Sequence, residues 1–80
     1  MVKIFDIVDN GDMIYCTYTP ENTNLKGTVD IDKKTLEIVN VNYSAYEYGK
    51  KMYVSHVLSK ISEFVTANKK LPKELVAIWY

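Results

Sequence analysis

His56 and Cys16 carry the two side chains best suited to catalytic chemistry at neutral pH. Histidine titrates near neutrality, and a thiol beside a histidine is the minimal pair for a nucleophile. No catalytic motif surrounds either residue. We expect Cys16 to face the core, where a thiol is inert, and His56 to lie with a polar neighbour at the edge of a helical apolar stripe. A small enzyme that uses His56 with Tyr53 or Cys16 is therefore the last of three functional hypotheses, and we assign no catalytic residue.

The acidic residues form no recognisable metal site. Residues 30–32 (Asp-Ile-Asp) begin like a calcium-binding loop, but Thr35 stands where that loop needs glycine and Val41 where it needs glutamate. No spacing of Cys and His suits zinc, and no glycine-rich loop suits phosphate. Three acids close to the first predicted turn are expected to be solvated: Asp6, Asp9 and Asp12. The sequence predicts neither a metal ion nor a cofactor.

The charges balance, with ten lysines against ten acidic residues. A general nucleic-acid binder needs a surplus of cations, and the chain has no arginine for bidentate contacts with phosphate or guanine. Residues 1–8 are too short and too acidic for a signal peptide, and no apolar run approaches the roughly 20 residues of a membrane span. A single cysteine allows no internal disulfide. We therefore expect a cytoplasmic protein without a membrane segment.

The length of 80 residues and the hydrophobic content of 48% predict one globular domain over residues 1–80. Asn10-Gly11 is typical of a tight hairpin turn, because both residues accept positive φ and apolar alternation flanks them. A turn centred there pairs Val8 with Met13. The register then places one set of side chains against the core: Phe5, Ile7, Ile14, Cys16 and Tyr18. The opposite face receives Val2, Ile4, Asp6, Val8, Met13, Tyr15 and Thr17.

Residues 27–32 and 35–41 form a second predicted hairpin around a turn that begins at Asp32. The register groups Val29, Ile31, Leu36 and Ile38 on one face. Val39 and Val41 then point to the other face, unless a bulge near Asn40 intervenes. The sequence leaves both arrangements open.

Ser44-Ala45-Tyr46-Glu47 matches a capping box, in which the serine accepts from the third helical amide and the glutamate reaches back to the serine amide. The helical pattern continues to about Asn68. Its apolar stripe contains Tyr46, Tyr53, Val54, Val57, Leu58, Ile61, Phe64 and Val65. Gly49 weakens the first turns. Pro72 ends the helical region, and residues 75–80 predict a last strand.

These elements predict an α+β fold: an antiparallel meander of four strands, one long amphipathic helix on one face, and a C-terminal fifth strand. The preferred sheet order is 5-1-2-3-4, with the fifth strand antiparallel to the first. A place parallel to the fourth strand is the alternative.

The helix covers one face of this sheet, and the other face is not cleanly polar. The apolar positions predicted there are Val2, Ile4, Tyr15, Val39 and Val41. The seven tyrosines and one tryptophan of the chain supply rigid contact surface of the kind found in interfaces. The first hypothesis is therefore a non-catalytic interaction module that forms a homodimer or binds an unknown protein partner through these five residues. The alternative of scattered surface apolar residues remains open.

The second hypothesis is a protein that binds single-stranded nucleic acid by stacking bases on Tyr15, Tyr43 or Tyr18. A local patch of lysines would supply the cations: Lys33, Lys34, Lys50 and Lys51. The neutral net charge and the absence of arginine argue against it.

Overall fold

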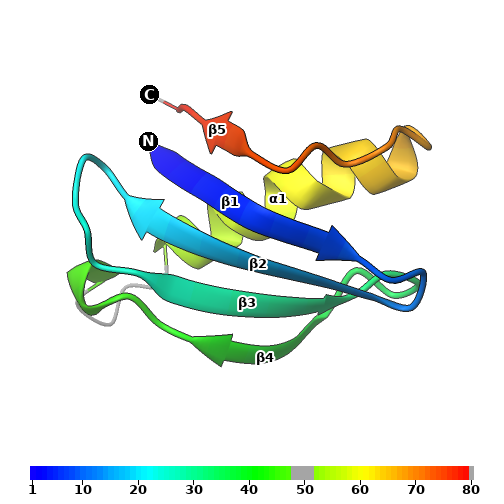
Figure 1. Ribbon diagram of the computed structural model, residues 1–80, viewed down its shortest axis with the longest axis horizontal. Helices are drawn as coiled ribbons and strands as arrows, with labels where there is room; N and C mark the ends of the chain where they lie inside the picture. The colour runs from blue at the N-terminus through cyan, green and yellow to red at the C-terminus, as the bar shows by residue number, and fades with distance from the viewer. Residues whose placement is uncertain (48–51, 80) are drawn as a thin grey trace.

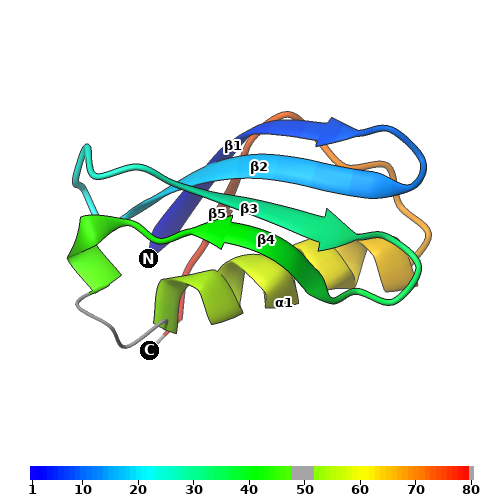
Figure 2. The same ribbon diagram turned by 90° about the horizontal axis from the view of Figure 1, so that it is seen from below.

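The computed structural model describes residues 1–47 and 52–79. Its elements are, in chain order, β1 (Val2–Asp9), β2 (Met13–Pro20), β3 (Gly27–Asp32), β4 (Ile38–Asn42), the 3₁₀ helix η1 (Ala45–Glu47), α1 (Met52–Thr66) and β5 (Leu75–Ala77). The strands form one antiparallel sheet in the order β4-β3-β2-β1-β5 (Figure 1). The helix α1 lies along one face of this sheet (Figure 2). The α+β class, the meander and the sheet order are confirmed.

The first hairpin turns one residue later than the sequence predicts. Asn10 Oδ1 accepts from the amides of Asp12 and Met13 at 3.0 and 2.8 Å, and Gly11 adopts a φ of 95°. Side-chain acceptors of this kind replace backbone partners in the turn. Asp9 therefore pairs with Ile14, and the predicted pair of Val8 with Met13 is wrong.

A β-bulge in β1 changes which residues face the helix. The register shifts between Phe5 and Val8, and Asp6 adopts a φ of 51°, the left-handed conformation that aspartate tolerates better than most residues. Alternation restarts after the extra residue, so residues before the bulge occupy faces opposite to those predicted. Val2 and Ile4 are fully buried on the helix side, and Phe5 turns away from it. The predicted placement of these three residues is wrong, whereas Ile7 faces the core as predicted.

A second bulge lies in β4. Asp32 Oδ1 accepts from the amides of Lys34 and Thr35, and the β3–β4 turn continues to Leu36, whose φ is 58°. Strand β4 therefore begins at Ile38 rather than at residue 35.

The register of β3 against β4 shifts by one residue between Asp30 and Ile31. Because of this shift, Ile38 and Val41 both pack against the core, and Val39 is 61% exposed. The bulged arrangement that the sequence left open is the one found, and the outward placement of Val41 is wrong.

The helical region begins differently from a capping box. Ser44 Oγ accepts from the amide of Tyr46 at 3.2 Å, and Glu47 Oε1 accepts from the amide of Tyr53 at 3.0 Å. Glu47 therefore caps the first turn of α1 instead of bonding back to Ser44, and the predicted capping box is wrong. The predicted contribution of Gly49 falls outside the described residues.

The core lies between α1 and the helix-facing side of the sheet. Four α1 residues of the predicted stripe are buried: Tyr53, Val54, Val57 and Ile61. Tyr46, Leu58 and Val65 pack against them, whereas Phe64 is half-buried outside this cluster. Strand β5 is shorter than predicted and pairs with β1 only over Val2–Ile4. No helix in the described part of the chain combines the length and the apolar character that a membrane span requires.

Candidate functional site

The sheet face opposite α1, called the outer face below, carries an apolar patch on β1 and β2. Strand pairing aligns Val8 with Tyr15, and Phe5 with Thr17, on this face. Tyr15 is 39% exposed and Val8 is 55% exposed, while Phe5 is half-buried. Val76 of β5 pairs with Lys3 and continues the apolar surface to the sheet edge. We call Phe5, Val8, Tyr15 and Val76 the outer patch.

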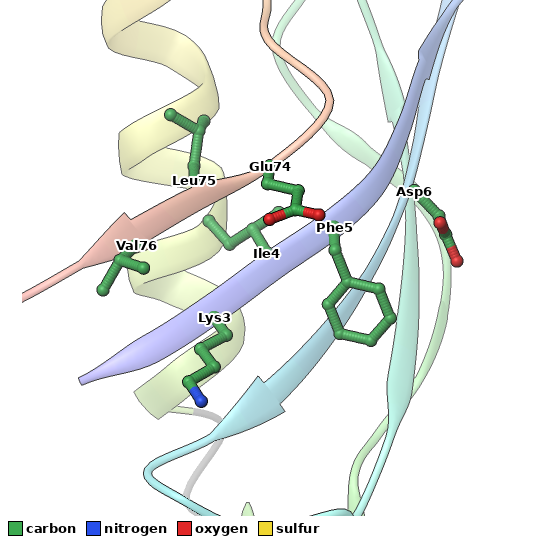
Figure 3. A pocket seen from close by; sticks show the side chains of 7 residues that line it. All are labelled: Lys3, Ile4, Phe5, Asp6, Glu74, Leu75 and Val76. Carbon is green, nitrogen blue, oxygen red and sulfur yellow. The ribbon is translucent and has the colours of Figure 1, made fainter.

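The outer patch borders a shallow hollow between β1 and β5. Figure 3 shows the side chains that line this cavity of about 520 Å³, which is open to solvent: Lys3, Ile4, Phe5, Asp6, Glu74, Leu75 and Val76. It forms where β5 pairs with β1 only over Val2–Ile4, while beyond the bulge the Ile7 amide donates to the carbonyl oxygen of Lys73 at 3.3 Å. The hollow therefore offers apolar walls from Phe5 and Val76 beside charged groups of both signs.

The β3–β4 half of the outer face is polar. Thr17, Thr28 and Asn42 align across three strands, and Asn42 Nδ2 donates to Thr28 Oγ1 at 3.3 Å. Tyr15 aligns with Asp30, which aligns in turn with Asn40. The outer face is thus polar on β3 and β4, whereas on β1 and β2 the apolar residues of the outer patch lie beside Lys3 and Thr17.

The structure brings together only part of the predicted partner-binding set. Tyr15 lies in the outer patch, and Val39 is exposed on the bulge of the edge strand β4. Val2 and Ile4 are buried under α1, and Val41 packs against the core, so none of these three contributes to the outer face. Partner binding itself stays a prediction.

Sequence reasoning missed Phe5 and Val76 as members of the outer patch. The only signal in the sequence for Phe5 is Asp6, because aspartate is among the few residues that accept the left-handed conformation of a bulge. For Val76 the signal is alternation within residues 75–77, once the position of the short strand is known.

A buried polar network joins the sheet to the start of α1 on the opposite side of the molecule. The Tyr18 hydroxyl donates to Glu47 Oε2 and accepts from the amide of Ser44 at 2.9 Å. Glu47 is 3% exposed, and Tyr18 is fully buried. Burial, together with the hydrogen bond to Glu47, raises the pKa of the Tyr18 hydroxyl above its usual range. The phenol therefore stays protonated, and the network fits a structural role.

A second carboxylate, that of Glu21, binds Tyr53 of α1 and the N-terminus. Glu21 Oε2 accepts from the Tyr53 hydroxyl at 2.7 Å and from the Met1 ammonium at 3.1 Å. These two donors lower the pKa of the Glu21 carboxyl, with the Tyr53 hydrogen bond contributing most. Glu21 lies at a solvent-exposed rim, so it contributes less to stability than a buried pair does.

No family model, curated protein or solved structure matches this chain.

His56 and Cys16 are each engaged in packing. The imidazole of His56 stacks on the indole of Trp79, with ring centroids 3.6 Å apart and planes 8° from parallel. Cys16 is buried, and its Sγ lies 3.7 Å from the carbonyl oxygen of Val29. Cys16 faces the core and His56 is half-buried at the edge of the apolar stripe, as predicted. Within residues 1–47 and 52–79, no three His, Cys, Asp or Glu side chains are grouped to hold a metal ion.

We expect the thiol of Cys16 to be almost unreactive in the folded protein. Burial, with the nearby Asp30 carboxylate, raises its pKa from 9.0 to about 12. Because the thiolate is the reactive form, its fraction at pH 7 falls about a thousandfold. Alkylation by iodoacetamide should be at least that much slower in buffer than in strong urea at the same pH. A native rate within about tenfold of the unfolded rate would contradict this packing.

The structure describes only part of the residue set of the nucleic-acid hypothesis. Tyr18 is fully buried and is unable to stack on a base, which is a correction to the predicted set. Tyr15 and Tyr43 are exposed, at 39% and 45%. Lys50 and Lys51 lie outside the described residues, and Lys33 pairs with Asp9 at 2.8 Å. Nucleic-acid binding remains a prediction, with two of its three tyrosines exposed.

Proposed function

We propose that this chain is a small interaction module that associates with itself or with a protein partner through its outer face. The observation that supports this function is the outer patch, in which the exposed Tyr15 and Val8 adjoin Phe5 on the sheet face away from α1. Exposed apolar surface that includes an aromatic residue is typical of interfaces, where buried aromatic anchors supply most of the affinity.

The surroundings of the patch support the same proposal. Threonine and asparagine side chains on β3 and β4 form a polar border, and an interface usually has a polar rim around an apolar centre. The shallow hollow between β1 and β5 is a depression beside the outer patch into which a partner side chain can insert. A cytoplasmic location, consistent with a single buried thiol, belongs to the same proposal.

Photo-crosslinking in cells that express the chain tests this function. With p-benzoylphenylalanine in place of Tyr15, irradiation should give a discrete adduct, because the probe lies within the outer patch. The same probe in place of Ser59, an exposed residue of α1, is the matched control and should give little of that adduct. An absence of any adduct at position 15, or equal adducts at both positions, would contradict the proposal.

A further inference from the structure

Lys3 and Asp30 lie at diagonally opposite positions on the outer face, and Asp6 and Glu74 line the hollow beside Lys3. Lys3 is the second residue of β1, and Lys26 precedes β3 at the same end of the sheet, with its Nζ 5.9 Å from the centroid of the Phe5 ring. Asp30 lies on β3 toward the other end, aligned with Tyr15. In the described part of the chain, neither Lys3 nor Asp30 has an ion-pair partner within the molecule. The face thus presents an unpaired cation and an unpaired anion on opposite sides of the apolar centre.

We infer that the occupant of the outer face is a second copy of this chain, packed face to face about a two-fold axis. A two-fold interface is self-complementary, so residue i of one copy meets residue j of the other, and j meets i. We place the two-fold axis in the plane of the interface, perpendicular to the line from Lys3 to Asp30 and through its midpoint. A rotation of 180° about this axis places each Lys3 over the Asp30 of the other copy. This arrangement forms two ion pairs and leaves neither charge facing its like. The inference rests on the proposed function and names its partner.

The same half-turn also matches the aromatic residues. With a rise of about 3.3 Å per residue and about 4.8 Å between strands, Lys3 and Asp30 lie about 16 Å apart on the face. Thr17 then falls close to the midpoint of that line, next to the axis. With these strand and residue spacings, Tyr15 of each copy lies over Phe5 of the other, which gives two symmetric aromatic contacts. The Lys3–Asp30 contacts and the Tyr15–Phe5 contacts therefore form in the same orientation of the two copies, which supports a second copy as the occupant.

Exchanging charges between two variants tests this arrangement. In sedimentation equilibrium of the purified chain from micromolar to millimolar concentration, the apparent mass should rise from 9.2 kDa toward twice that value. Lys3→Glu and Asp30→Lys should each weaken self-association about tenfold or more, since each homodimer then has two like-charge contacts. An equimolar mixture of the two variants should restore association, because both contacts in the mixed dimer pair opposite charges. The association should also weaken with added salt.

Lys69→Glu, which reverses an exposed charge beyond α1, is the matched control and should dimerise like the parent chain. Circular dichroism and urea midpoints confirm that each variant is folded. A parent chain that stays at 9.2 kDa throughout, or a mixture no better than its separate variants, would overturn the inference. If the parent chain is monomeric while position 15 crosslinks to a protein of another mass, the inference fails and the proposed function stands. If position 15 gives no adduct and the chain is monomeric, both fail.

Discussion

Replacing Glu47 with alanine is expected to remove about 3–5 kcal/mol from the free energy of unfolding, as breaking a buried charged contact does elsewhere. The change leaves the buried Tyr18 hydroxyl without its acceptor and removes the cap on the Tyr53 amide. A domain of this length has about 4–12 kcal/mol of stability in total. The variant should therefore unfold at a much lower urea concentration, as followed by circular dichroism.

Tyr53→Phe is the matched control for the Glu47 variant. It also removes one hydroxyl–carboxylate hydrogen bond, but the acceptor Glu21 keeps the Met1 ammonium and lies at a solvent-exposed rim. Its cost should be at most about 1 kcal/mol. If Glu47→Ala costs no more than Tyr53→Phe, the buried network does not hold η1 and α1 to the sheet.

The role of Glu47 was misassigned from sequence because local and tertiary partners compete for the same carboxylate. Its spacing from Ser44 fits a capping box, and this motif takes account of only four consecutive residues. In the fold, the Tyr18 hydroxyl on β2 and the Tyr53 amide on α1 are both within reach of Glu47. These contacts join segments 29 and 6 residues away in sequence, so no local pattern contains them.

The topology was predictable because it follows from periodic patterns that extend over many residues. Alternation in the strands and the 3.6-residue stripe in α1 are repeated over many positions, so a single irregularity does not erase them. The sheet order follows from short antiparallel connections, with β5 placed beside β1. The helix-facing positions of β2 and β3 were therefore assigned correctly: Ile14, Cys16, Tyr18, Val29 and Ile31 are all buried.

The outer face was only partly predictable because each bulge inverts the alternation on one side of it. One extra residue at Asp6 moves Val2 and Ile4 into the core and moves Phe5 out. The bulge in β4 turns Val41 inward and leaves Val39 exposed. Tyr15 lies on β2, which has no bulge, and it was placed correctly. The prediction of an apolar outer face therefore remains, with Phe5 in place of the buried valine and isoleucine.

Gly27→Ala is expected to destabilise the protein by about 2–3 kcal/mol or more, as overpacking does in well-packed cores. Gly27 is the cross-strand partner of Tyr18, whose ring covers it. A Cβ added at Gly27 would lie 2.4 Å from Tyr18 Cε1 and 2.7 Å from the backbone nitrogen of Ser44. Neither atom is free to move, because Tyr18 is fully buried and its hydroxyl accepts from that same Ser44 amide.

The sign of the Gly27 effect separates packing from backbone propensity. Alanine in a strand is ordinarily more stable than glycine by about 0.5–1 kcal/mol, so propensity alone predicts a gain. Thr28→Ala, at the exposed neighbouring position, is the control and should change the free energy of unfolding by less than about 0.5 kcal/mol. A higher urea midpoint for Gly27→Ala than for the parent chain would mean that Tyr18 does not lie against this glycine. A large loss would show that the absence of a side chain at Gly27 is what allows the Tyr18 hydroxyl to reach both Ser44 and Glu47.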